Sequence, residues 1–145
     1  GNFINTASLA GLMTAPLMAS YNVTKAAVVA LSDTMHHELK PYGIGTTVLC
    51  PGFFRTNLDK GMRTSDPQLL KMVDKVFESS ELTADDVADI CYRDMKKNKL
   101  ICNPHKMGRR AYFIKRYMPW LFSHLVGKTA TKMKKYDPAF AQNKK

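Results

Sequence analysis

The sequence contains the pentapeptide Tyr21-Asn22-Val23-Thr24-Lys25, which places a phenol four residues before an ammonium group. Residues four apart lie on the same face of a helix, so these two side chains can meet. A phenol ordinarily loses its proton near pH ~10, and a neighbouring cation favours the phenolate. Such a pair can pass a proton near neutral pH, which is what general acid–base catalysis requires.

Two further segments flank this motif. Ser8 lies thirteen residues before the tyrosine and directly follows the strand-like run Phe3-Ile4-Asn5-Thr6-Ala7, where its hydroxyl is placed to hold a substrate oxygen. After the motif, Thr46-Thr47-Val48-Leu49-Cys50 reads as a second strand that runs into a Pro51-Gly52 turn. The sequence therefore predicts two strands separated by a helix over roughly residues 19–39, which Pro41 and Gly43 end.

Together these elements resemble the classical short-chain dehydrogenase/reductases. In that family a serine at a strand end, a Tyr-x-x-x-Lys motif and a later Pro-Gly loop surround a nicotinamide. The matching text is Asn5-Thr6-Ala7-Ser8, Tyr21-x-x-x-Lys25 and Pro51-Gly52-Phe53-Phe54-Arg55-Thr56. The resemblance implies an α/β fold, namely the C-terminal half of a Rossmann-type doubly wound parallel sheet, with a basic helical extension at the C-terminus.

The resemblance also implies the role of each catalytic residue. Tyr21 is expected to protonate a carbonyl during reduction, or to act as the base in alcohol oxidation. Lys25 is expected to promote ionisation of the tyrosine and to hydrogen-bond the nicotinamide ribose, while Ser8 orients the substrate oxygen. The expected activity is hydride transfer between NAD(P) and a carbonyl or alcohol carbon.

The cofactor loop is expected to begin at Pro51 and Gly52, which together remove a backbone donor and allow a sharp turn. By resemblance, the backbone from Phe53 to Phe54 contacts the carboxamide, and Thr56 contacts the carboxamide or a phosphate. The family more often has an aliphatic residue at the position of Phe54. The cofactor is expected to be NAD or NADP, with NADP slightly favoured.

The glycine-rich turn that cradles a dinucleotide pyrophosphate at a helix N-terminus has no counterpart in these 145 residues. We therefore expect the chain to be the C-terminal half of such an enzyme, with little activity alone. The residues that read the ribose 2′ position also belong to that other half, so the sequence leaves NAD and NADP open.

The predicted sheet is small. The sequence offers three strand candidates, the third at Leu100-Ile101-Cys102, whereas a doubly wound sheet has about five or six strands. The sheet should therefore have an unpaired edge, and we expect the chain to pair with another copy or with its other half. By resemblance, the helix that contains Tyr21 would contribute to a homo-oligomer. The alternative is a non-catalytic oligomerisation or membrane-surface module.

The charge divides the chain into two parts. Residues 1–90 carry 7 Lys and Arg against 10 Asp and Glu, whereas residues 91–145 carry 15 against 2. We divide the chain into a catalytic half-domain, residues 1–107, and a basic, aromatic-rich helical tail, residues 108–145. The tail could contact a membrane surface, cover the substrate pocket or form a subunit interface, and no nucleic-acid fold signature accompanies it. The expected location is cytoplasmic, with peripheral membrane contact as an option.

Apolar segments on both sides of the catalytic motif suggest a lipophilic carbonyl or alcohol as substrate. They are Met13–Met18 and Leu58–Phe77, the latter including a short helix from Leu69, although many of their side chains could equally belong to the core. The three cysteines form no Cys-x-x-Cys pattern and no metal site is expected. A further helix should follow Thr83, a favourable N-cap residue.

Overall fold

The structure is a computed structural model that describes residues 1–54 and 80–133. Three parallel strands form one sheet in the order β1 (Asn2–Thr6), β2 (Gly45–Leu49) and β3 (Ile101–Cys102). Thr6 pairs with Leu49, and Leu49 pairs with Cys102, so the three strands end level with one another. The segments that follow the strands therefore meet at one edge of the sheet, which we call the carboxyl edge.

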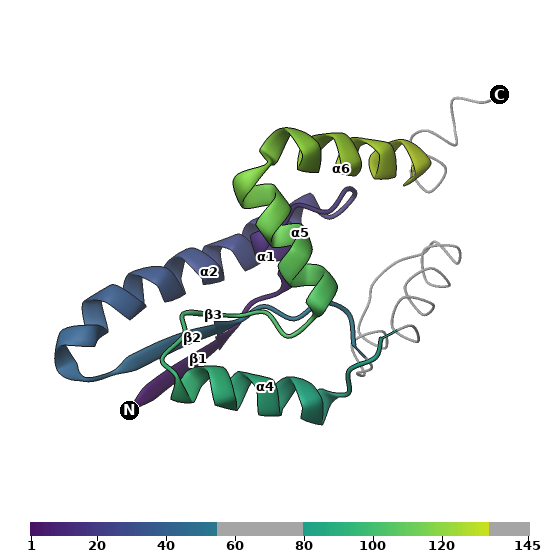
Figure 1. The fold of residues 1–145 in the computed structure, drawn as a ribbon. Coiled ribbons are helices and arrows are strands. Elements are labelled where there is room, and N and C mark those ends of the chain that lie inside the picture. The colour runs from purple at the N-terminus through teal and green to yellow at the C-terminus, as the bar shows by residue number, and fades with distance from the viewer. Residues whose placement is uncertain (55–79, 134–145) are drawn as a thin grey trace.

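Helices cover both faces of the sheet. Helix α2 (Ala19–Leu39) lies on one face and α4 (Ala84–Lys96) on the other (Figure 1). The core contains Ala7, Leu12, Val48 and Cys50, against which partly buried side chains of α2 pack. The prediction of an α/β fold with a parallel sheet is confirmed.

Local sequence explains where α2 ends. It spans the predicted residues 19–39 and is followed by the 3₁₀ turn η1 (Lys40–Tyr42), after which Gly43 adopts φ 68°. Val28 and Val29 face the core, whereas Val23 and Leu31 on the other side of the helix are largely exposed. The described residues therefore leave part of the apolar surface of this helix exposed.

The segment after β1 begins with the short helix α1 (Leu9–Leu12). The Ala10 N–H donates a 3.2 Å hydrogen bond to Oγ of Ser8, which is the N-cap residue. A serine oxygen can satisfy an otherwise unpaired amide of the first turn, and this stabilises a helix that composition alone did not suggest.

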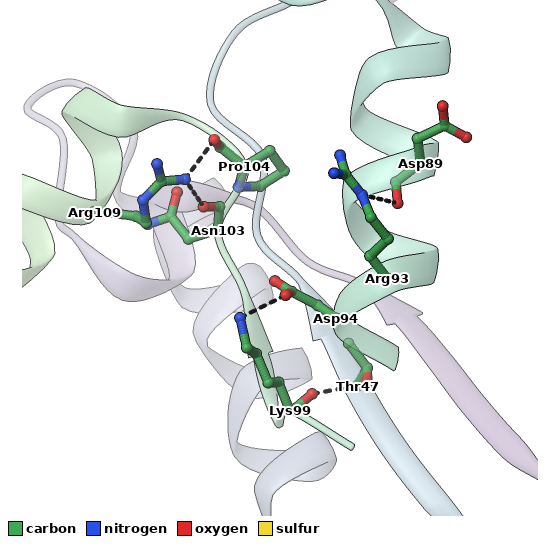
Figure 2. A network of polar contacts seen from close by, with 8 residues as sticks. All are labelled: Thr47, Asp89, Arg93, Asp94, Lys99, Asn103, Pro104 and Arg109. Carbon is green, nitrogen blue, oxygen red and sulfur yellow. Dashed lines mark hydrogen bonds and ion pairs between the residues drawn. The ribbon is translucent and has the colours of Figure 1, made fainter. Parts of the chain in front are cut away.

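The other face of the sheet is fastened by polar contacts around α4. Thr83 and Asp86 form the capping box that starts the helix, as the sequence predicted for Thr83. Figure 2 shows how Lys99 bridges the end of α4 and the sheet: its ammonium donates to Asp94 at 2.6 Å, and its carbonyl accepts from Oγ1 of Thr47 at 2.8 Å. These contacts fix the turn that leads into β3.

Within the described residues, the outer edge of β1 has no strand partner. Phe3 and Ile4 on this strand are about half exposed. This agrees with the expected unpaired edge, while the pairing partner stays a prediction.

Two helices make up the C-terminal region, α5 (Lys106–Tyr117) and α6 (Pro119–Met133). Gly108 and Tyr112 turn α5 towards Leu9 and the core, and the Lys115 ammonium donates to the Leu12 carbonyl at 2.9 Å. Helix α6 packs against α5 and lies beyond it, away from the sheet (Figure 1). The expected division between residues 107 and 108 falls inside α5, which joins the tail to the core.

Candidate active site

The Tyr21–Lys25 motif lies over the carboxyl end of β1. The Lys25 ammonium donates to the carbonyl oxygen of Thr6 at 3.4 Å, and its nitrogen lies 5.8 Å from the centroid of the Tyr21 ring. The tyrosine side chain stays 36% exposed. The phenol and the ammonium group lie on one face of the helix, as the four-residue spacing predicted, and the Lys25 contact places them at the edge of the sheet.

Ser8 lies two residues beyond β1, at the same edge. Its oxygen accepts from the Ala10 amide, and its hydroxyl hydrogen meets no acceptor within the described part of the chain. A serine hydroxyl can accept and donate at once, so capping leaves the donor available for a substrate oxygen. Of the three predicted catalytic residues, Ser8 therefore caps α1, and Tyr21 and Lys25 lie on α2, which contacts α1 at this end of the sheet.

Gly11 brings α1 directly onto the catalytic helix. A Cβ at this position would lie 2.6 Å from the backbone oxygen of Lys25 and 3.1 Å from a methyl group of Val29. No side chain fits there without moving one helix, so glycine sets how closely Ser8 and Lys25 approach. The sequence analysis did not single out this residue.

Asn22 is buried inside the catalytic motif and holds the loop that precedes it. Its Nδ2 donates to the carbonyl of Ala15 at 2.9 Å, and its Oδ1 accepts from the Ala15 amide at 3.5 Å. The same loop contains Leu17 with φ 63°, an uncommon conformation for a residue with a branched side chain. The amide of Asn22 thus fixes one wall of the site.

The Pro51-Gly52 turn follows β2 at the carboxyl edge, as predicted. The Pro51 carbonyl accepts from the Leu9 amide at 2.8 Å, and the Gly52 amide donates to Nδ1 of His105 at 3.1 Å. The ring of Phe54 lies 6.3 Å from that of His105. Residues 51–54 of the expected cofactor loop are therefore held from both sides, while Thr56 and the Leu58–Phe77 wall lie outside the described residues.

His105 is the site residue that sequence reasoning missed. Burial lowers its pKa from the usual 6.5, the Phe53 backbone opposes this shift, and the charge of Arg109 adds to it. Arg109 itself donates to the carbonyls of Asn103 at 3.0 Å and Pro104 at 2.7 Å (Figure 2). A neutral imidazole with Nδ1 as its acceptor is the form that fits the Gly52 amide.

Cys50, which directly follows β2, is buried. Burial raises the pKa of Cys50 to about 12, so it is a thiol at neutral pH and a poor nucleophile. Over residues 1–54 and 80–133, no group of three His, Cys, Asp or Glu side chains could hold a metal ion.

Comparison with known proteins agrees with this geometry. A family model described as short chain dehydrogenase matches residues 1–67, which include Ser8, Tyr21, Lys25 and the Pro51-Gly52 turn. Over these residues the chain matches the short-chain dehydrogenase family. It is 26% identical over 135 residues to dehydrogenase/reductase SDR family member 7B of the mouse, covering 93% of this chain and 42% of the relative. It is 29% identical over 127 residues to the probable oxidoreductase EphD of Mycobacterium bovis, covering 82% and 22%.

Solved structures of short-chain dehydrogenases share the fold of this chain. A Burkholderia phymatum short chain dehydrogenase/reductase in complex with NAD superposes with a TM-score of 0.71 at 26% identity, covering 83% of this chain and 48% of that one. A Burkholderia cenocepacia short chain dehydrogenase in complex with NADP gives 0.68 at 17% identity, covering 87% and 47%, and supports the fold. The chain thus spans less than half the length of these relatives.

Proposed function

We propose that the chain supplies the catalytic side of an NAD(P)-dependent oxidoreductase that acts on a carbonyl or alcohol group. The observation that carries this proposal is the Lys25 ammonium, which lies against Thr6 at the end of β1 and beside the Tyr21 ring. A phenol, an ammonium and a serine hydroxyl converge where the strands of a parallel sheet end. Ligands of open α/β sheets bind at such carboxyl ends.

The polar groups at this edge fit a nicotinamide ribose and a substrate oxygen. An ammonium has three N–H donors, and Lys25 uses one of them in a long hydrogen bond of 3.4 Å. The hydroxyl groups of Ser8 and Tyr21 have no acceptor among the described residues. The site therefore offers donors for oxygen atoms that the described residues do not provide.

The proposed proton path follows from these donors. NAD(P), when bound, supplies or accepts the hydride. During reduction, the Tyr21 hydroxyl gives its proton to the carbonyl oxygen, and Ser8 holds that oxygen by donating a hydrogen bond. Lys25 stabilises the phenolate that forms. In alcohol oxidation the phenolate takes the hydroxyl proton, and the same residues act in reverse.

Residues 51–54 are proposed to face the nicotinamide carboxamide, with Thr56 as a further contact. The Gly52 turn is suited to this because it has no side chain and is held by His105 at 3.1 Å. Either NAD or NADP is compatible with these residues, and NADP is our preferred candidate.

Weak activity of the isolated 145 residues is part of the proposal. No glycine-rich turn that could cradle a pyrophosphate occurs in the sequence. Cofactor affinity would then depend on a second half-domain, as the coverage of less than half of each relative suggests. A lipophilic substrate is proposed from the apolar, methionine-containing loop between α1 and α2, in which Leu17 is exposed.

A second candidate role is self-association through α2. Val23 and Leu31 are exposed on the side of the helix away from the sheet, beside three exposed alanines at positions 26, 27 and 30. Small residues let two helices approach closely, so this side could pair with another copy. Sedimentation of the wild-type chain and of Leu31→Glu tests this role, because a monomer in both cases would exclude it.

Fluorescence titration with NADH and NADPH tests the oxidoreductase proposal. We expect a longer protein, in which a glycine-rich half precedes these residues, to bind at least one of them, and the 145-residue chain to bind far more weakly. Lys25→Met should weaken binding by the longer protein, whereas Lys40→Met, at the far end of α2, should not. Absence of binding by the longer protein would favour the non-catalytic interaction module instead.

A further inference from the structure

Helices α5 and α6 present an unusual combination of charge and exposed aromatic rings. Between residues 106 and 133 the sequence has seven Lys and Arg residues and no Asp or Glu. Within the same span, large apolar side chains are exposed, including Trp120 at 72% and Met107 at 81%. In a monomer, such an exposed apolar patch marks an interaction surface, and its rim of cations indicates an anionic partner.

The contacts of α5 define which side faces outward. Gly108, Tyr112 and Lys115 face the core, through Leu9 and the Leu12 carbonyl. The opposite side of the helix carries Lys106, Arg110, Phe113 and Tyr117, which follow one another at intervals of three and four residues. All four are exposed, so the outward side of α5 carries two cations followed by two aromatic rings.

Helix α6 also carries an exposed aromatic ring and exposed basic residues. Its Phe122 turns inward, since the Lys115 ammonium lies 5.9 Å from that ring. Trp120, His124 and Lys128 are spaced four apart on a different side and are all exposed. We use the name tail surface for the outward side chains of both helices: Lys106, Arg110, Phe113, Tyr117, Trp120 and Lys128.

We infer that the tail surface binds the headgroup region of an anionic lipid bilayer. Tryptophan and tyrosine settle at the boundary between headgroups and acyl chains, while lysine and arginine beside them reach the lipid phosphates. No described helix is long and apolar enough to cross a bilayer. The tail surface would therefore lie along the membrane plane.

The cations of the tail surface are available to a partner. Within the described residues, Lys106, Arg110 and Lys128 make no hydrogen bond or ion pair. Binding them to lipid phosphates therefore breaks no internal contact. A basic residue near an anionic membrane surface contributes roughly a fivefold gain in affinity.

The aromatic geometry favours lipid over single-stranded nucleic acid. Nucleic-acid binding of this kind uses ring faces on which bases stack. The rings of Phe113 and Tyr117 contact each other at an interplanar angle of 43°, with centroids 4.6 Å apart, so they do not form parallel faces between which bases could stack. The two rings can enter a headgroup layer together without breaking this contact.

Trp120 provides a direct measurement, because it is the single tryptophan of the chain. We expect its emission to shift to the blue on addition of vesicles that contain phosphatidylserine, and expect little shift with phosphatidylcholine alone. Brominated lipids should quench it. High salt should reverse the binding, since the attraction is partly electrostatic.

Matched variants locate the binding surface. Replacing both Lys106 and Arg110 by glutamine should weaken vesicle binding roughly twentyfold, because two cations are lost. The control replaces Lys40 and Lys97, exposed cations outside the tail surface, by glutamine and should bind as the wild type does. Circular dichroism verifies that each variant is folded.

Three outcomes would overturn the inference. They are an unshifted Trp120 spectrum with anionic vesicles, equal binding to neutral and anionic vesicles, and equal weakening by the tail and control variants. A spectral shift with single-stranded RNA but not with vesicles would identify nucleic acid as the partner instead. None of these results depends on oxidoreductase activity, so the experiments test membrane binding by the tail surface separately from the proposed oxidoreductase function.

Discussion

The backbone amide of Gly52 donates a 3.1 Å hydrogen bond to Nδ1 of His105, which lies 53 residues further along the chain. This bond joins the turn after β2 to the segment after β3. It requires a ring nitrogen that accepts, so the conformation of the turn is linked to a neutral His105. A doubly protonated ring presents an N–H at Nδ1 and cannot accept.

Replacing the His105 acceptor should therefore destabilise the protein. His105→Leu leaves the Gly52 amide without its partner, and we expect a loss of about 1–3 kcal/mol in the free energy of unfolding. His105→Asn keeps an acceptor near the position of Nδ1 and should lose less. Denaturant titration compares the two variants, and equal losses would show that the hydrogen bond is not what stabilises the turn.

The same contact predicts a dependence on pH. The folded-state pKa of His105 lies below its usual 6.5, chiefly because of burial. The unfolded chain then binds more protons than the folded one, so stability rises with pH across this range. The contribution of the neutral ring is complete above pH 6.5 and is lost as the pH falls through the lowered folded-state value.

Thermal melting from about pH 7.5 to pH 5 measures this effect in the wild type and in His105→Asn. The variant cannot titrate at this position, so its melting temperature should fall less on acidification. Parallel curves for the two proteins would assign the acid sensitivity to other groups.

Gly11 should tolerate no larger residue. Gly11→Ala places a methyl group 2.6 Å from the Lys25 carbonyl oxygen, and relieving this overlap should cost about 1–3 kcal/mol of stability. Gly127→Ala is the matched control, because a Cβ there has nothing within 4 Å and alanine favours a helix by about 1 kcal/mol. Calorimetry should show opposite shifts in melting temperature, and shifts of the same sign would refute the packing argument.

Asn22 should matter through the loop that it holds. Asn22→Ala removes the partner of the Ala15 carbonyl, so we expect a loss of about 1–3 kcal/mol and faster hydrogen exchange at residues 13–18. Thr24→Ala serves as a control, because the Thr24 hydroxyl bonds within its own helix, to the Tyr21 carbonyl. Unchanged exchange in Asn22→Ala would show that the loop is held by other contacts.

The sequence predicted those parts of the fold that depend on local patterns. Periodicity and breakers located α2 and the three strands, and the four-residue spacing predicted that Tyr21 and Lys25 share one face of the helix. The cap at Thr83 was also predictable, because its partner Asp86 lies within the same turn. In each case the interacting groups are close in sequence.

Contacts between distant segments could not be predicted in this way. Gly11 is required because α1 packs against the backbone of Lys25, and a single glycine does not reveal what lies opposite it. His105 had no partner at a recognisable spacing, since its partner is a backbone amide after another strand. The sequence shows that the tail is basic and aromatic. It could not show that Lys115 donates a hydrogen bond to the Leu12 carbonyl, because these two residues are 103 positions apart.

Turnover by Tyr21→Phe is the most direct test of the central proposal. The variant belongs in a longer protein that joins these residues to a glycine-rich dinucleotide-binding half, assayed with NADH and NADPH and a panel of lipophilic ketones. Loss of the hydroxyl removes the proposed proton donor, so kcat should fall roughly 100- to 10,000-fold while cofactor binding persists. Tyr42→Phe, at the opposite end of α2, should retain full turnover. Unchanged turnover in Tyr21→Phe would contradict the assignment of this residue as the catalytic acid.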